Sequence, residues 1–425
     1  MQLRINQLAR IEGHADLVVD LEKGELVSCR FEVVETPRFF EGILTGLHYR
    51  EVAGVVSRIC GICSHSHSLV SLTATEDALG IDISDQTRLL RELLLCGELL
   101  QSHLVQLYFM ALPDYLRLPS LIQAAKSDRT LLERALRLKK GANAICEVIG
   151  GRPVHPVTLR VGGFASLPER KELLQLQQHL RNLLPDLEET IDLFAGLDIP
   201  LFSRPVSNVS LQGDGGYPVF GTHMESSDGA VLPVAGYVGQ INERLVAHAT
   251  AKHAEMEGHR YRVGSLARLN NHHQGLAPMA AKVAAVLRIG PGEENPYRML
   301  LARLVEVVHF VERGIQLIDR LEDYDLAPEE PPLPRRFGSG VAAVEAPRGL
   351  LLHAYRYGEE GRLLEADCVI PTAQNLASLE EDLAGRVPEI AHLEPDEVSR
   401  QLEMLIRAYD PCISCATHLL RVKYV

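Results

Sequence analysis

The chain has 425 residues, of which 46% are hydrophobic and 23% are charged, a composition that is ordinary for a soluble globular protein of two or three domains. Its formal net charge of −13 argues against a phosphate-binding surface, and therefore against nucleic acid as a partner. No stretch reaches about 18 uncharged apolar residues and the first residues lack an apolar signal segment, so we expect neither a membrane span nor a cleaved leader.

The first part of the chain predicts a small sheet followed by helices. Residues 1–35 alternate short apolar runs with turns, which is typical of an antiparallel sheet. Residues 39–47 predict a short helix. Dense apolar residues at helical spacing over 86–112 indicate a long buried helix, which Pro113 should end.

Helical periodicity continues through the middle of the chain. The strongest signal covers residues 296–321, where apolar residues recur at i, i+4 and i+7 on one face. Residues 197–232 are rich in glycine, proline and serine, which predicts strands and loops. The further helices that we expect span residues 127–149, 173–193 and 238–256.

The C-terminal third predicts a second sheet region. Residues 327–334, rich in proline and glutamate, indicate a linker. Beyond it we expect strands at 341–344, 350–357 and 368–370, and helices at 374–383 and 395–409. The prediction is a mainly α fold with α+β parts, in which a central bundle of long helices joins small antiparallel sheets near the N-terminus and in the C-terminal third. We expect a single domain over 1–425. Its parts would be an N-terminal sheet with the first cysteine motif at 1–70, a helical bundle at 71–325, a C-terminal α+β part with the second cysteine motif at 335–418, and a tail at 419–425.

Eight cysteines are present, and four of them form two Cys-x-x-Cys pairs, Cys60 with Cys63 and Cys412 with Cys415. Such pairs favour metal binding in a reducing compartment over disulfides. The two sulfurs of one pair can face one metal from a single turn, so each pair is a bidentate unit. The other cysteines, of which we expect the first three to be core thiols, are Cys29, Cys96, Cys146 and Cys368.

The two pairs could bind separately or fold into one four-thiolate site, which would suit zinc, an iron–sulfur cluster or another thiolate-rich redox centre. A structural zinc site is the simplest interpretation of the cysteines alone. Two observations count against it, because the pairs come from opposite ends of the chain and polar side chains suited to proton transfer flank both. These flanking residues are Arg58, His67, Asp410 and His418.

Both pairs stand in longer motifs that resemble the paired signatures of the nickel–iron hydrogenase large subunit, Arg58-x-Cys60-Gly-x-Cys63-x-x-x-His67 and Asp410-Pro-Cys412-x-x-Cys415-x-x-His418. Further matching segments stand in the family's order along nearly the whole chain. They are Arg10 to His14, Arg38 to Leu44, Gly264 to Arg268, Ala346 to Gly349, and Val369 to Thr372. The length and the Ile413-Ser414 pair resemble most the cytosolic, cofactor-linked members of the family.

The resemblance implies the large-subunit fold of that family and the reaction H2 ⇌ 2 H+ + 2 e−. Cys60 and Cys412 would be terminal nickel ligands, whereas Cys63 and Cys415 would bridge nickel to iron. Soft thiolates suit such metals, and the iron would also carry carbon monoxide and cyanide.

Other side chains would surround the metals. Arg348 would lie over their open face, where a guanidinium could polarise hydrogen or, with an unusually low pKa, act as the base. Asp114 and Asp410 are candidates to hold Arg348 in place. His67 would hydrogen-bond a bridging cysteine. The pocket for the diatomic ligands, with a hydroxyl that donates to a cyanide, would be lined by Leu351, Pro371 and Thr372.

The resemblance also implies a proton route and a second metal. A proton released at Cys412 or Arg348 would leave through Glu12, the family's relay position. A magnesium ion would be held by Glu41, His418 and the backbone carbonyl of Cys368, which are hard oxygen and nitrogen ligands.

No further cysteine motif could hold a chain of iron–sulfur clusters. Electrons must therefore leave through a separate iron–sulfur small subunit, and then reach flavin- and NAD(P)-binding diaphorase subunits in the cytoplasm. Family members are matured by nickel-insertion factors and a protease that cuts after the last histidine, so residues 419–425 are interpreted as a short cleavable extension; the alternative is that this chain is not cleaved. Two alternatives are an energy-converting, hydrogenase-like subunit, whose complex I members have lost these cysteines, and a structural four-cysteine zinc scaffold.

The remaining histidines carry weaker signals. Five of them suggest a second metal cluster, but helix spacing and surface exposure explain them more simply, so we assign no metal to them. They are His248, His253, His259, His272 and His273. His155 resembles a family loop near the partner subunit.

Overall fold

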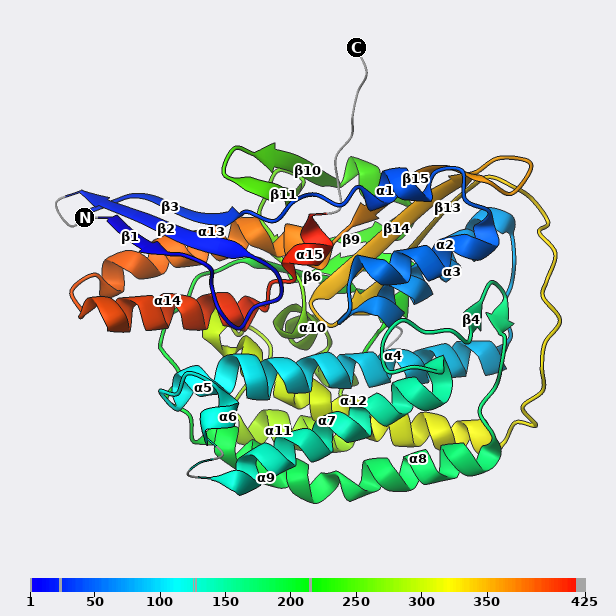
Figure 1. Cartoon of the computed structure of the whole chain (residues 1–425), viewed down its shortest axis with the longest axis horizontal. Helices are drawn as coiled ribbons and strands as arrows, with labels where there is room; N and C mark the ends of the chain where they lie inside the picture. Colours follow the sequence, from blue (N-terminus) through cyan, green and yellow to red (C-terminus); the bar gives the residue numbers. More distant parts are fainter. Residues whose placement is uncertain (1, 23–24, 125, 127, 214–215, 418–425) are drawn as a thin grey trace, which may run out of the picture.

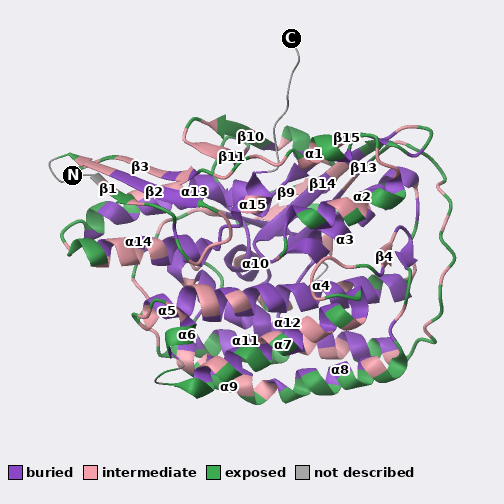
Figure 2. Cartoon of the chain, in the orientation of Figure 1, coloured by how far each residue is buried: buried purple, intermediate pink, exposed green. Residues whose placement is uncertain are grey.

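The computed structural model describes residues 2–22, 25–124, 126, 128–213 and 216–417. It has two halves, one of long helices and one in which small sheets pack with further helices (Figure 1). The helical half contains α4 (Asp85–Val105), α7 (Arg129–Gly150), α8 (Arg170–Asn182), α9 (Leu184–Ala195) and α12 (Met299–Glu322). The central helix α4 contacts α7 and α12 and is mostly buried, whereas α8 and α9 expose one face (Figure 2).

The expected helix at 173–193 is divided into α8 and α9. The break falls at Leu183, and Pro185 stands in the first turn of α9. Proline lacks an N–H and clashes with the preceding turn of a helix, so it is tolerated only where a new helix begins.

The long helix predicted at 86–112 does not end at Pro113. From α4 it continues through a π-helical turn, η2 (Gln106–Ala111), into α5 (Leu112–Tyr115). In this wider turn the N–H of Leu112 donates to the carbonyl of Leu107. The shift in hydrogen bonding lets the helix pass a residue without an N–H. Residues Asp85–Tyr115 are long and apolar enough to cross a membrane, but 83% of the most apolar window is buried inside the protein.

The predicted helix at 238–256 is wrong. The segment is an antiparallel hairpin of β10 (Ile241–Val246) and β11 (Ala249–Met256). Its alanines and charged residues favour a helix locally, but β11 packs on α13 (Pro371–Ile390) and on β3 (Glu25–Val33). Tertiary packing of this kind overrides intrinsic propensity.

The N-terminal sheet is confirmed, with the antiparallel order β1-β2-β3, in which β1 is Gln2–Ile5 and β2 is Ala15–Glu22. In the C-terminal third the sheet has the order β15-β14-β13-β7. Its strands are β13 (Ser339–Ala346), β14 (Gly349–Tyr357), β15 (Leu363–Val369) and β7 (Phe220–Gly221). A third sheet, β12-β6-β8-β9, contains Tyr261–Arg262, Ser207–Leu211, His223–Ser226 and Val231–Pro233, and a small hairpin pairs β4 (Leu159–Arg160) with β5 (Gly163–Phe164).

The remaining helices connect and cover these sheets. Helix α3 (Ser64–Leu79) packs on β13 and β14. The other α-helices are α1 (Phe40–Leu44), α2 (Tyr49–Val56), α6 (Leu121–Ala124), α10 (Ser265–His272), α11 (Pro278–Val286), α14 (Pro395–Tyr409) and α15 (Ile413–Ala416). The 3-10 turns are η1 (Ser57–Ile59), η3 (Val234–Gly239), η4 (His273–Gly275) and η5 (Pro296–Arg298).

The last described residues return to the start of the chain. Glu12 and Cys412 form an isolated parallel bridge, in which the N–H of Ile413 donates to the carbonyl of Glu12 over 3.0 Å. Gly13 adopts a φ of +86°, and a Cβ there would lie 2.5 Å from the side chain of Ile413. Only glycine allows this close approach, which places Glu12 beside the second cysteine motif.

Candidate metal centre

The four cysteines of the two pairs meet in one buried cluster. The Sγ atoms of Cys60 and Cys412 are 3.3 Å apart, as are those of Cys63 and Cys415, and Cys412 lies 3.0 Å from Cys415. All four atoms lie within 4.8 Å of one another. The prediction of one four-sulfur site is therefore confirmed in its geometry.

Two charged residues, the half-buried Arg38 and the buried Glu98, hold the cysteine loops in place. The guanidinium of Arg38 donates to the carbonyls of Ile59 and Ser414, one in each loop. Glu98, on α4, accepts from the backbone N–H groups of His65 over 2.6 Å and Ser66 over 2.8 Å. These N–H groups belong to the buried first turn of α3, where they have no partner within the helix. The carboxylate therefore caps the helix that follows Cys63 and interacts favourably with its positive end.

The cluster needs positive charge. Burial and the neighbouring Cys415 raise the pKa of the Cys412 thiol, whereas hydrogen bonds from Cys412 and Cys415 lower the pKa of Cys60. Four sulfurs at these separations cannot all be thiolates without a cation between them. Soft thiolates bind first-row transition metals, so the residues present fit a nickel–iron centre.

A carboxylate touches one of these cysteines. The Sγ of Cys412 donates to Oε2 of Glu12 over 3.1 Å, and the N–H of Ser414 donates to the same oxygen over 3.0 Å. The backbone bridge and these two contacts fix the carboxylate at the sulfur. Glu12 can therefore receive a proton from Cys412 without moving.

A fixed cation lies beside the cluster. Arg348 stands in the two-residue turn between β13 and β14, since Ala346 pairs with Gly349. Its Nε donates to the carbonyl of Asp410 over 2.8 Å, and its terminal nitrogens to Oδ1 of Asp410 over 3.0 Å and to Oγ of Ser102 over 3.4 Å. Burial opposes its charge, but Asp410 and the cysteine sulfurs outweigh burial and raise the pKa of Arg348 further above its ordinary range. The raised pKa favours a permanently charged Arg348 and disfavours its predicted alternative role as a base.

A small cavity of about 10 Å³ opens against the sulfurs. Arg348 and three of the cysteines reach it, and its other lining residues are His67, Ala346, Leu351, Ile370, Pro371 and Thr372. The hydroxyl oxygen of Thr372 accepts from the N–H of Cys412 over 3.0 Å, so its hydrogen remains free to donate. Thr372 lies in the first turn of α13, whose positive end faces the cavity and favours anionic ligands there.

Comparisons with known proteins agree with this geometry. A family model described as nickel-dependent hydrogenase matches residues 38–134 and 248–418, and a HoxL-like model matches residues 2–36. The alpha subunit of sulfhydrogenase 1 from Pyrococcus furiosus is 33% identical over 99% of this chain and 99% of its own. The chain belongs to the nickel-dependent hydrogenase family. It is the catalytic large subunit of a nickel–iron hydrogenase, an oxidoreductase that acts on H2.

A second relative supports the family, and solved structures share the fold of this hydrogenase subunit. The alpha subunit of sulfhydrogenase 2 from Pyrococcus furiosus is 32% identical over 99% of this chain and 100% of its own. The structure of an NAD+-reducing [NiFe]-hydrogenase in the H2-reduced state superposes with a TM-score of 0.88, at 25% identity, and covers 98% of this chain and 99% of that one. A nickel–iron–selenium hydrogenase from Desulfovibrio vulgaris Hildenborough, at 22% identity, has a TM-score of 0.81 over 98% of this chain and 100% of its own. The predicted fold is confirmed.

The carboxylate of Glu41 lies in a different pocket of the hydrogenase subunit. Its Oε1 accepts from the N–H of Cys368 over 2.9 Å. A cavity of about 520 Å³ is lined by Glu41, Asp367, Glu243 and Lys252. Burial and the Asp367 carboxylate raise the pKa of Glu41 to about 8. Carboxylates crowded in this way suit a hard cation, but His418, the third predicted ligand, lies outside the described residues.

His67 lines the cavity beside Cys63 but has another partner. Its Nδ1 lies 3.2 Å from Nε2 of His353, and burial lowers the pKa of His67 to about 4. The neutral ring is therefore part of a buried chain that continues from His353 to Tyr355 over 2.7 Å. The expected hydrogen bond from His67 to a bridging cysteine stays a prediction.

The assignment of Asp114 to Arg348 is corrected by the structure. The carboxylate of Asp114 pairs with Arg10 through Oδ1 and with Arg407 over 2.7 Å through Oδ2. Both of its oxygens are thus used at the end of the π-helical turn, and Ser102 supplies the second contact of Arg348 instead. Asp114 joins the N-terminal loop to α14.

Several residues of the site were missed by the sequence reasoning. Glu98 could have been found, because a glutamate within an apolar helix indicates a buried carboxylate with partners. Ser102 and His353 gave no such signal, since serine and histidine are common in many environments. The residues missed are Arg38 as a link between the loops, Glu98, Ser102 and His353.

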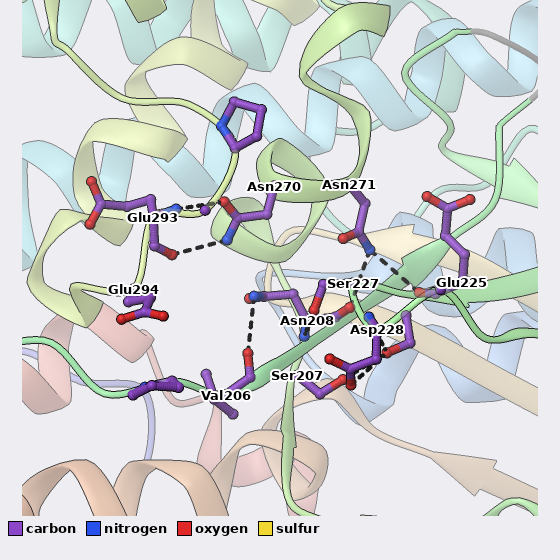
Figure 3. Close-up of a pocket in the computed structure, with 15 residues that line it drawn as sticks. Val206, Ser207, Asn208, Glu225, Ser227, Asp228, Asn270, Asn271, Glu293 and Glu294 are labelled. Atoms are coloured by element: carbon purple, nitrogen blue, oxygen red, sulfur yellow. Dashed lines mark hydrogen bonds between the residues drawn. The ribbon is translucent and has the colours of Figure 1, made fainter.

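A much larger cavity lies away from the hydrogenase centre. It has a volume of about 700 Å³ and lies between β6, the end of β8, α10 and the loop at 291–294 (Figure 3). Many of its polar groups bond to one another, as where Asn270 donates to the carbonyl of Glu293 over 3.0 Å and Asn271 to the carbonyl of Asn208 over 3.2 Å. None of the predicted site residues lines it.

Proposed function

We propose that this large subunit passes electrons from H2 to an iron–sulfur small subunit and then to NAD(P)-binding diaphorase subunits in the cytoplasm. The observation that carries its catalytic part is the four-sulfur cluster with Glu12 at Cys412 and Arg348 beside the open cavity. Among the described residues no second group of cysteines could hold an electron-transfer cluster. The similarity to an NAD+-reducing hydrogenase supports the acceptor.

The proposed metal ligands differ in their surroundings. Cys63 and Cys415 would bridge nickel and iron, and both line the cavity together with Cys412. Cys60 and Cys412 would be terminal on nickel, and Cys412 alone contacts Glu12. Leu351 and Pro371 would pack against the diatomic ligands, while the free hydroxyl hydrogen of Thr372 would donate to a cyanide.

The protein's own groups would handle charge and protons. Bound nickel and iron would supply the redox chemistry that takes up the electrons of H2. Arg348, held by Asp410, would place a permanent positive charge at the cavity and polarise H2 as it splits. Glu12 would take the proton from the Sγ of Cys412 and pass it outward.

A magnesium ion would occupy the pocket of Glu41, with the carbonyl of Cys368 and the side chain of His418. The raised pKa of Glu41 supports this, because a divalent cation would relieve the repulsion from Asp367. Removal of residues 419–425 by a maturation protease, after nickel insertion, remains part of the proposal. Cleavage after His418 would leave that histidine at the new C-terminus.

Metal analysis of the purified enzyme tests the central proposal. We expect nickel and iron near one each per chain from the large-subunit centre, after the small subunit's iron is subtracted, and infrared bands from carbon monoxide and cyanide. H2-dependent reduction of NAD+ or NADP+ by the whole complex tests the acceptor. Zinc in the cysteine site without such bands would contradict the assignment and support a zinc scaffold. Proton pumping without an NAD(P) reaction would support the energy-converting alternative.

Replacing Glu12 with glutamine should lower H2 oxidation by about a hundredfold or more, since general acid–base groups commonly contribute about 10² to 10⁴. The amide keeps the acceptor oxygen for Ser414 but cannot take a proton from Cys412. Nickel and iron contents should not change. The measurement is turnover with an artificial electron acceptor, and Glu32→Gln on β3 should keep normal turnover as the matched control. Equal turnover in Glu12→Gln and the parent enzyme would exclude the relay role.

A further inference from the structure

A second group of side chains that could hold a metal ion lies outside the cysteine cluster. The ligand atoms of His248, His253 and Glu380 all lie within 4.8 Å of one another. His248 stands in the turn of the β10–β11 hairpin, His253 on β11, and Glu380 on α13. The sequence does not predict this group. Its pattern over 238–256 indicates a helix and not a hairpin, and Glu380 lies far away in the sequence.

The carboxylate of Glu380 faces both imidazoles. Its Oε1 lies 2.6 Å from Nε2 of His248, and its Oε2 lies 3.8 Å from Nδ1 of His253. The two rings are 5.8 Å apart and nearly perpendicular, at 85°. The N–H of Phe31, on β3, also donates to Oε1 over 2.9 Å. The Glu380 carboxylate thus joins α13 to the β10–β11 hairpin and to β3, and the backbone N–H of Phe31 fixes its position.

The buried histidine of this group has one ring nitrogen without a hydrogen-bond partner among the described residues. The side chain of His253 is only 3% exposed, and its Nε2 has no hydrogen-bond partner in the part of the chain that the structure describes. Its Nδ1 points to Glu380 from 3.8 Å, which is beyond hydrogen-bonding distance. A buried polar group without a partner costs about 1–3 kcal/mol. A cation between Nδ1 and the carboxylate would give the ring a direct bond on the side that faces Glu380, where the 3.8 Å separation provides none.

We propose that His248, His253 and Glu380 bind a zinc ion that fastens the β10–β11 hairpin to α13. Two imidazoles and one carboxylate are a common zinc ligand set, with a water as the fourth ligand. His248 is 23% exposed, so the water enters on its side. Ligand bonds of about 2.0–2.2 Å in a tetrahedron separate ligand atoms by about 3.5 Å, so the ion replaces the direct His248–Glu380 contact after a small adjustment.

The site has a structural role. Thr250, in the same hairpin, donates to the carbonyls of Val33 over 3.1 Å and Glu35 over 2.7 Å, which ties β11 to the end of β3. Glu380 lies on the helix that begins at the catalytic cavity, about 12 Å along the axis from Thr372 at about 1.5 Å per residue. The zinc ion therefore fixes α13 relative to the N-terminal sheet without contacting the reacting atoms.

Zinc content of the complete, matured enzyme tests the site. After equilibration in a buffer of low micromolar free zinc and gel filtration, we expect one zinc per large subunit in addition to nickel and iron. Glu380→Gln and His248→Gln should each weaken zinc binding by at least about tenfold to a hundredfold, since even changes to groups that support metal ligands cost that much. Substitution with Co²⁺ should give the strong visible absorption of a four-coordinate site. These readouts do not depend on hydrogenase turnover.

His259→Gln is the matched control, because His259 is exposed and follows the same hairpin without belonging to the group. It should retain zinc at the level of the parent enzyme. The proposal fails if the parent enzyme binds no zinc at micromolar concentration, or if His259→Gln loses zinc as fully as His248→Gln. Selective retention of nickel over zinc at this site would overturn the choice of metal. His248 lies in a turn and is partly exposed, so its variant tests binding without loss of the fold.

Discussion

Replacing Arg348 with lysine should lower hydrogenase turnover by about a hundredfold or more while nickel and iron remain bound. Arg348 reaches Asp410 through two different nitrogens, one to the backbone carbonyl and one to Oδ1. A lysine amine is a single flexible point charge and cannot span both. Loss of one preorganised charged donor commonly costs about 10² to 10³ in turnover. The four cysteines are untouched, so metal content should stay normal.

Arg356→Lys is the matched control for this variant. Arg356 also lies on β14, but it is exposed and pairs with the exposed Glu365. Its replacement should leave turnover within about twofold, because surface ion pairs contribute about 0–1 kcal/mol. Turnover and metal content should be measured on the same preparations. If Arg348→Lys lost its metals, the arginine would be needed for assembly of the centre; if it kept normal turnover, its catalytic role would be excluded.

Local patterns predicted the parts of the fold that local interactions determine. The long helices α4, α7 and α12 each follow a strong apolar periodicity, and their existence did not depend on distant residues. The β10–β11 hairpin could not be predicted in this way, because its alanines and charged residues form a strand only when packed on β3 and α13. Pro113 is a similar case, since a π-helical turn lets the helix continue past it.

The candidate site shows the same division. Residues inside the quoted motifs are brought together as expected, as where Glu12 meets Cys412 and Arg348 meets Asp410. Partners that fall outside motifs were misplaced or missed. The family resemblance suggests Asp114 as a partner of Arg348, yet its carboxylate pairs with Arg10 and Arg407. Such pairings depend on which side chains the fold brings within hydrogen-bond distance, and the sequence order does not determine this.

A buried ion network beneath the catalytic turn was also outside the reach of sequence reasoning. Arg268, fully buried on α10, donates through two nitrogens to Glu306 over 2.6 and 2.7 Å. A third nitrogen donates to Glu345 over 2.9 Å and to the carbonyl of Ala346 over 3.1 Å. Arg268 outweighs the effect of burial and lowers the pKa of Glu306 well below its ordinary range. The network therefore supports β13 just before the turn that carries Arg348.

Replacing Arg268 with methionine should destabilise the subunit by about 3–5 kcal/mol, because it leaves two buried carboxylates without their cation. The free energy of unfolding, measured by denaturant titration of the metal-loaded subunit, gives this change directly. Arg260→Met is the matched control, since Arg260 pairs with Glu381 at an exposed position and should change stability by at most about 1 kcal/mol. Arg268 also bonds to Ala346, next to the turn that carries Arg348. Arg268→Met enzyme that still folds should therefore turn over more slowly, whereas proton transfer from Cys412 to Glu12 should not change. Equal unfolding free energies for the two variants would mean that Glu306 and Glu345 carry no charge in the folded protein. Arg348 would then be held in place by Asp410 and Ser102 alone.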